Sequence, residues 1–185
     1  MVASDEYRDR AVALMKSSFE SRGQATLDRL DQDDMQRTCS RYPGKTPPAD
    51  VAARLEKAQL ATVKYPADGK LLGDWRAGEK VAQTGVGLQF SDPPGSDAGG
   101  NCYACHQLTQ AEISFGTIGP SLYGFGKTRG YTDEMRKYVY AKVYNSQAFN
   151  ACSNMPRFGY KSILSEQQIK DVTALLLDPA SPVNR

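Results

Sequence analysis

The sequence has no apolar run long enough to cross a bilayer, and it has only one histidine, His106. Because a membrane-spanning helix needs about 20 predominantly apolar residues, no such helix is expected. Charge of one sign is not concentrated anywhere. Residues 1–73 carry 12 basic and 11 acidic side chains, and residues 74–185 carry 11 and 10. A chain with neither a basic arm nor an acidic tail is not expected to bind nucleic acid.

Strand patterns are also missing, since no segment shows convincing alternation of apolar and polar residues. There is no internal repeat and no low-complexity tract. Helical patterns occupy residues 4–20, 26–40, 48–65, 74–85, 132–146 and 165–177, between stretches rich in glycine and proline. The sequence therefore predicts an all-α protein with long loops. The break before Gly73 predicts two parts, an N-terminal helical extension at residues 1–73 and a domain at residues 74–185.

Local signals predict where several helices begin. Ser4, Asp74 and Thr132 are typical N-cap residues. The last helix has the strongest signal, because Ser165 and Gln168 have the spacing of a capping box. Leu164 and Ile169 flank that box where a hydrophobic staple would lie.

The stretch "GGNCYACHQL", residues 99–108, places Cys102, Cys105 and His106 close together. Two thiols three residues apart share one face of a helical turn, so each can add to one vinyl group of a porphyrin while the adjacent imidazole faces the iron. Structural zinc needs four ligands, and only Cys39 and Cys152 remain as cysteines outside the motif. A redox dithiol expects a βαβ context, which is absent. Zinc, a redox dithiol and purely structural cysteines remain alternatives to haem.

The segments around the motif resemble class I cytochrome c. The segment "GPSLYGFGK", residues 119–127, follows the motif as a Gly-Pro-x-Leu segment does in that family. The resemblance implies that the Pro120 carbonyl accepts a hydrogen bond from His106 and that Leu122 packs on the porphyrin. The stretch "GEKVAQTG" resembles the family's N-terminal helix, in which Gly78 would let the C-terminal helix cross closely. Residues 86–100 depart from the family, because its first helix runs almost directly into the motif.

The sixth iron ligand must come from elsewhere in the chain, and a second histidine does not exist. Met155 is the predicted axial partner of His106, because Met15 and Met135 belong to apolar helical stripes whereas Met155 lies in a loop. Cys152 is the alternative ligand. A haem with histidine and methionine ligands has a comparatively high potential, and filled axial sites favour electron transfer over substrate binding.

The family resemblance also implies a compartment. The first ten residues carry charges where the apolar region of a signal peptide would be, so the chain is either cytoplasmic or a processed mature form. Because covalent haem is attached outside the bacterial cytoplasm, the resemblance implies a processed, periplasmic chain. A disulfide between Cys39 and Cys152 is then expected. Free thiols at both positions, or an intermolecular bond from Cys39, are the alternatives.

A narrower resemblance covers roughly residues 70–185. The stretches "GGNCYACHQL", "IGPSLYGFG", "NMPRFG" and "LLLDPASPVN" together resemble SoxX, the family of monohaem subunits of SoxAX cytochrome complexes. The resemblance implies one covalent haem c, a SoxA-type partner subunit, the carrier SoxYZ and a small acceptor cytochrome c. The chain alone would be non-catalytic, as the electron-relay subunit of a heterodimeric L-cysteine S-thiosulfotransferase. A free-standing periplasmic electron carrier is the main alternative, and a haem-based gas sensor is disfavoured because Met155 would fill the sixth position.

Overall fold

A computed structural model describes residues 5–185, and in that range the chain is almost entirely helix and loop. Its only β-type pairing there is an isolated bridge between Arg22 and Ala25. The all-α prediction is therefore confirmed. The α-helices are α1 (Asp5–Ser18), α2 (Asp34–Cys39), α3 (Ala49–Leu60), α4 (Trp75–Gln83), α5 (Phe125–Arg129), α6 (Asp133–Tyr144) and α7 (Glu166–Leu177). The 3-10 turns are η1 (Leu27–Leu30), η2 (Cys102–Ala104), η3 (Ser146–Ala148) and η4 (Pro182–Asn184).

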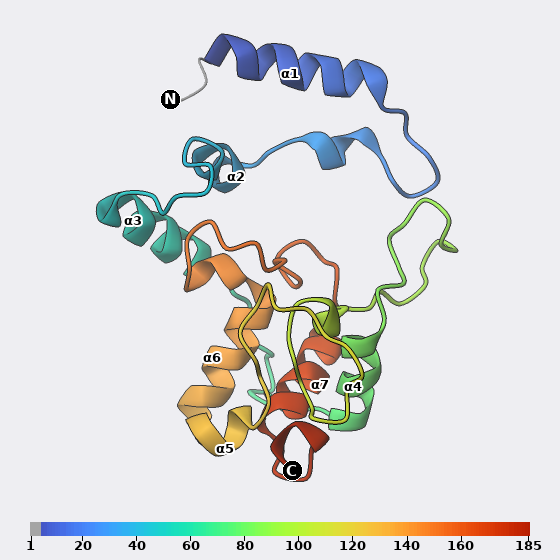
Figure 1. Ribbon diagram of the computed structural model, residues 1–185, viewed down its shortest axis with the longest axis vertical. Coiled ribbons are helices and arrows are strands. Elements are labelled where there is room, and N and C mark those ends of the chain that lie inside the picture. The colour runs from blue at the N-terminus through green and yellow to red at the C-terminus, as the bar shows by residue number, and fades with distance from the viewer. Residues whose placement is uncertain (1–4) are drawn as a thin grey trace.

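The hydrophobic core lies where α4, α6 and α7 meet, at the opposite end of the molecule from α1 (Figure 1). Helix α7 is buried from Ile169 to its last residue, Leu177, because its neighbours cover it on several sides. Burying apolar side chains in this way is the main favourable term in folding. The core side chains from α4, α6 and α7 are Val81, Ala82, Val139, Tyr140, Val143, Ile169, Val172, Leu175, Leu176 and Leu177.

The crossing of α4 and α7 depends on two glycines. A Cβ atom at Gly78 would lie 2.1 Å from the Asp171 carbonyl oxygen, and one at Gly73 would lie 2.0 Å from Asp171 Oδ1. No larger residue fits either position without moving α7. The role expected for Gly78, a close approach of the C-terminal helix, is confirmed.

The predicted helix starts agree with the structure wherever they can be compared. The side chains of Asp74, Thr132 and Ser165 each accept a hydrogen bond from a backbone N–H of the first turn. Gln168 completes the capping box, because its Oε1 accepts from the Ser165 N–H at 2.9 Å. Ser4, the fourth predicted N-cap, lies outside the described residues.

The helix predicted at residues 26–40 is wrong in part, because the structure divides it into η1 and α2. The physical reason is Asp33, which has extended backbone geometry and whose side chain accepts from the Gln36 N–H. Asp33 therefore begins a new helix where an uninterrupted one was expected. The helix predicted at residues 48–65 is also shorter, since α3 ends at Leu60.

Helix α1 is present, but its apolar stripe, which includes Met15 and was expected to be buried, faces solvent. Met15 is 39% exposed, and Leu14 is 67% exposed. In Figure 1 helix α1 lies away from the core, above the irregular stretch that includes η1. An ion pair joins Lys16 of α1 to Asp31 of that stretch at 2.5 Å.

The N-terminal segment (residues 5–73) contacts the insertion (residues 86–100) that departs from the family pattern. Arg29 Nη1 donates to the Leu88 carbonyl at 2.6 Å, and Gln24 Nε2 donates to the Gln89 carbonyl at 2.9 Å. A Cβ atom at Gly23 would lie 2.7 Å from the Phe90 carbonyl oxygen, so the two segments approach closely there. The two additions to the cytochrome pattern therefore pack against one another.

Candidate functional site

The two motif cysteines lie on one turn, η2, directly after the insertion. The Cys102 carbonyl accepts hydrogen bonds from the N–H groups of Cys105, at 3.1 Å, and His106, at 2.8 Å. The turn is attached to the end of α4, because the Gly100 N–H donates to the Val81 carbonyl at 2.8 Å. Neither motif cysteine is in a disulfide, so both thiols remain available.

His106 is oriented by the Gly-Pro segment that follows the motif. Its Nδ1 lies 2.7 Å from the Pro120 carbonyl oxygen, to which it donates a hydrogen bond. The Gly119 N–H donates to the Cys105 carbonyl at 2.8 Å, and a Cβ atom at Gly119 would lie 2.2 to 2.7 Å from the imidazole ring. With Nδ1 as donor, Nε2 is the nitrogen left to bind a metal. The hydrogen bond expected of Pro120 is present.

Leu122, the other predicted pocket residue, is half-buried. It packs against the hydrophobic core, and its N–H donates to the Gln107 carbonyl at 2.8 Å. This bond ties the Gly-Pro segment to the residue directly after His106. The contact of the Leu122 side chain with a porphyrin stays a prediction.

The thiol of Cys102 does not have the character of a redox dithiol. Burial raises its pKa to about 11, with the neighbouring Cys105 adding to the effect. Reactive thiols in Cys-x-x-Cys redox motifs have a lowered pKa, because the thiolate is the nucleophile. The environment of Cys102 therefore disfavours the redox-dithiol alternative.

Met155 lies in the loop that joins η3 to α7, which we call the Met155 loop (residues 149–165). Its half-buried side chain packs against the hydrophobic core. Its carbonyl accepts a hydrogen bond from the buried Ser146 Oγ at 2.5 Å, and its N–H donates to Ser153 Oγ at 3.2 Å. The backbone at Met155 is thus held at both its N–H and its C=O.

Cys39 and Cys152 form a disulfide across a sequence separation of 113 residues, with their Cα atoms 5.4 Å apart. The expected pairing is therefore found, in place of the free thiols or intermolecular bond that were the alternatives. A sulfur in a disulfide is no thiolate ligand, so Cys152 is no longer a rival to Met155 as an axial ligand. Because both sulfurs are in the disulfide, neither Cys39 nor Cys152 can serve as a ligand of a structural zinc site. Among residues 5–185 no group of three or more His, Cys, Asp or Glu is arranged to hold a metal ion.

Sequence reasoning missed the residues of the N-terminal segment that hold the Met155 loop. Asp33 Oδ2 pairs with Arg157 Nη2 at 2.6 Å, and Glu56 Oε1 accepts from the Ala151 N–H at 2.9 Å. Gln59 Oε1 accepts from Arg157 Nη1 at 3.2 Å. The only local signal was the spacing of Asp33 and Gln36, which is that of a capping box and marks a helix start.

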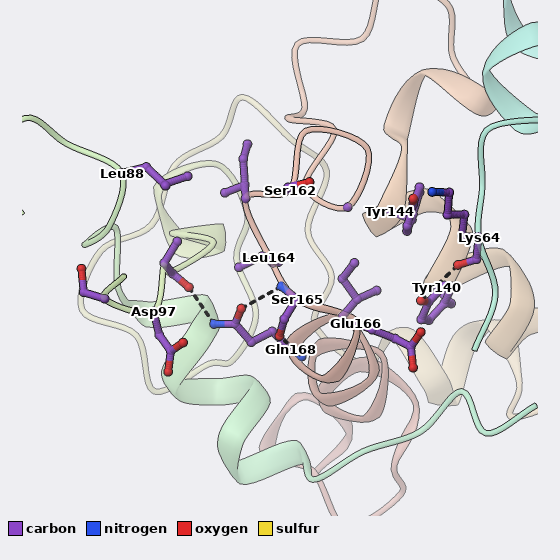
Figure 2. Close-up of a pocket in the computed structure, with 15 residues that line it drawn as sticks. Lys64, Leu88, Asp97, Tyr140, Tyr144, Ser162, Leu164, Ser165, Glu166 and Gln168 are labelled. Carbon is purple, nitrogen blue, oxygen red and sulfur yellow. Dashed lines mark hydrogen bonds between the residues drawn. The ribbon is translucent and has the colours of Figure 1, made fainter. Parts of the chain in front are cut away.

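Two clefts lie beside helix α7 and the Met155 loop. One, of about 450 Å³, opens at the N-terminal end of α7, where Gln168 Nε2 donates to the Ala98 carbonyl and Tyr140 donates to the Lys64 carbonyl (Figure 2). None of the predicted haem-binding or axial residues lines it. The other, of about 820 Å³, separates residues 32–46 from the Met155 loop, and Met155 is among its lining residues.

The chain belongs to the cytochrome c family, whose pattern matches residues 75–178. A protein of Aquifex aeolicus (strain VF5) named "Uncharacterized lipoprotein" is 40% identical over 157 residues, which cover 83% of this chain and 73% of that protein. Among solved structures, SoxXA from P. pantotrophus matches with a TM-score of 0.42 and 24% identity, covering 64% of this chain and 95% of that chain. No helix among the described residues is long and apolar enough to span a membrane.

Cytochromes c bind haem covalently, and the residues present here fit that group. Two unbridged cysteines lie on one turn, and the adjacent imidazole is fixed by Pro120 so that one nitrogen remains for iron. Gly119 leaves no room for a side chain against the ring, as expected where a ligand histidine is closely packed. The pairing expected from the sequence, histidine with methionine, is one that cytochromes c use for electron transfer, and it stays a prediction here.

Proposed function

We propose that the chain is the monohaem electron-transfer subunit of a SoxAX-type complex, with residues 74–185 as its haem domain. The observation that carries the electron-transfer role is the fixed His106, whose Nδ1 donates to Pro120 at 2.7 Å. Cys102 and Cys105 would attach one haem c, which supplies a one-electron couple when bound. His106 and Met155 would be its axial ligands, and filled axial positions leave no place for substrate on the iron.

The SoxX assignment is supported by the C-terminal motif, which is part of the folded domain. Asn184 Nδ2 donates to the Leu176 carbonyl at 3.0 Å, and Asn184 Oδ1 accepts from the Gly126 N–H at 2.8 Å. The buried Ser181 Oγ donates to the Leu175 carbonyl at 2.5 Å. The stretch "DPASPVN" therefore closes the end of α7 and joins it to α5, so its sequence is constrained by packing in the domain that carries the haem motif.

In this role the chain accepts electrons released when a SoxA-type partner joins thiosulfate to the carrier SoxYZ, and passes them to a small cytochrome c. The location we propose is the periplasm. The disulfide between Cys39 and Cys152 suits an oxidising compartment. The Aquifex relative is named a lipoprotein, which agrees with a site outside the cytoplasm.

A free-standing electron carrier is the second candidate, and one observation favours it. The N-terminal segment, which could have served a permanent partner, is instead engaged within the chain through the disulfide and the Asp33–Arg157 ion pair. A reinforced haem domain of this kind needs no second subunit.

The covalent haem is the first expectation to test. Acid-acetone extraction of the holoprotein should leave the colour on the protein, and its mass should exceed that of the polypeptide by one haem. Replacing Cys102 and Cys105 together with serine should make the haem extractable, because thioether bonds can form only at these two thiols. Colour that extracts from the unmodified protein would contradict this assignment.

Co-purification separates the two candidate functions. A subunit of a SoxAX-type complex should travel with a second cytochrome at one-to-one stoichiometry, and the isolated chain should show no turnover of thiosulfate. A chain that purifies alone from its native source, with full electron exchange with a small cytochrome c, would support the free-standing carrier. Thiosulfate-dependent activity of the isolated chain would overturn both.

A further inference from the structure

We infer that Asp33, in the N-terminal segment, is a positioning residue for Met155, because it fixes the Met155 loop two residues beyond that side chain. The inference rests on the proposed function, since it takes Met155 as the axial ligand. It assigns a role in the haem site to a residue that lies before the cytochrome c match at residues 75–178.

The first step is the burial of Arg157. Its side chain is only 5% exposed, and its guanidinium lies over the Tyr160 ring, 4.8 Å from the ring centroid. A guanidinium stays charged in proteins, so a buried one requires an anion nearby. The anion that contacts it is Asp33, at 2.6 Å, and Gln59 adds an acceptor at 3.2 Å. Both partners belong to the N-terminal segment, so the side chain of Arg157 is bound to that segment.

Asp33 is itself held at both carboxylate oxygens. Oδ1 accepts from the Gln36 N–H at 2.9 Å and so caps α2, whereas Oδ2 accepts from Arg157 and also pairs with Lys161 at 3.2 Å. Burial by itself would raise the pKa of Asp33, but the hydrogen bonds from Gln36, Arg157 and Lys161 outweigh it and lower the pKa below its usual value. The carboxylate is therefore a fixed point that joins the start of α2 to two places in the Met155 loop.

The contact between Asp33 and Arg157 restrains Met155 because of where it lies in the loop. Upstream of Met155 the loop is held by the disulfide at Cys152, and at Met155 the carbonyl is held by Ser146. A loop tied only upstream can still pivot about that tie and swing its side chain. The contact of Asp33 with Arg157 is the first tie downstream of Met155, ahead of the Gly159 and Tyr160 N–H groups that donate to the Tyr144 carbonyl at 3.0 Å. With the disulfide at Cys152, it places Met155 between two points that are fixed to the N-terminal segment.

The test compares the same substitution at adjacent positions. In Asp33→Ser, serine can still cap α2, because serine is among the preferred N-cap residues, but the anion facing Arg157 is lost. Asp34→Ser is the matched control: Asp34 is exposed, pairs only with Arg37 of its own helix, and carries the same charge. In the ferric holoprotein, Asp33→Ser should weaken the near-infrared band of the methionine–iron bond. It should also raise the affinity for imidazole by about tenfold, within the range usual for coupling between sites. Asp34→Ser should change neither.

A second variant keeps the test decisive if Asp33→Ser does not fold because Arg157 is left unpaired. The double variant Asp33→Ser/Arg157→Met removes the buried guanidinium together with its half-buried partner carboxylate, which often preserves stability, yet it also removes the tie. It should show the same gain in imidazole affinity.

Equal imidazole affinity for Asp33→Ser, the double variant and Asp34→Ser would overturn the inference. Met155→Ala distinguishes that failure from failure of the proposed ligand set. If Met155→Ala abolishes the near-infrared band while Asp33→Ser behaves like the control, the positioning role alone is wrong. If the band survives Met155→Ala, the assignment of Met155 fails and the inference falls with it.

Discussion

Replacing Met155 with alanine is expected to abolish the weak near-infrared band of the ferric protein and to lower the reduction potential on the order of 100 mV, a fraction of the roughly 0.8 V over which axial ligands set haem potentials. The physical reason is that a thioether ligand favours the reduced state, and an alanine provides no donor to replace it. The measurements are the absorption spectrum and a redox titration of the purified holoprotein.

Met135→Ala is the matched control for this change. Met135 lies on α6 and packs against the same hydrophobic core as Met155, so its truncation removes a similar side chain. It should lower stability while leaving the band and the potential unchanged. A Met155→Ala protein that retains the band would show that another residue fills the sixth position.

Replacing Cys39 with serine is expected to have the largest effect on folding. The disulfide spans 113 residues, and chain entropy alone predicts a loss of about 4–5 kcal/mol in the free energy of unfolding, an upper figure because native strain subtracts from it. Urea unfolding of the variant and of the native protein measures the difference. Because Cys152 lies three residues before Met155, the variant should also bind cyanide more tightly.

The single variant leaves a thiol at Cys152, which could itself approach the iron. The double variant Cys39→Ser/Cys152→Ser removes that complication and should show the same loss of stability with no thiolate spectrum. Peptide mapping under non-reducing conditions gives an independent check. Free thiols at both Cys39 and Cys152 in the native protein would contradict the prediction.

The parts of the fold that the sequence predicted well depend on short-range chemistry. The capping box of Ser165 and Gln168 and the caps at Asp74 and Thr132 involve residues within three positions of one another. The hydrogen bond from His106 to Pro120 spans 14 residues, and it could be expected because the family resemblance supplied it.

The parts that escaped prediction depend on contacts with no local signature. The ion pair of Asp33 with Arg157 joins residues 124 positions apart, and nothing in the sequence near either residue marks it as half of an ion pair. The apolar stripe of α1 was expected to be buried, since helical periodicity indicates a face but not whether anything covers it. The split at Asp33 was missed because one aspartate can continue a helix or begin one, and its partners decide which.

The disulfide has a consequence for how the protein matures. Cys102 and Cys105 lie between Cys39 and Cys152 in the sequence, so both motif thiols are inside the loop that the disulfide closes. Of the single disulfides that four cysteines can form, only this one leaves both haem-attachment sulfurs reduced. The half-buried Cys102, with its raised pKa, is a poor nucleophile in thiol exchange, which slows its wrong pairing. In a chain that carries the proposed haem, disulfide formation between Cys39 and Cys152 and thioether formation at Cys102 and Cys105 would therefore be separate steps of maturation, each confined to its own pair of cysteines.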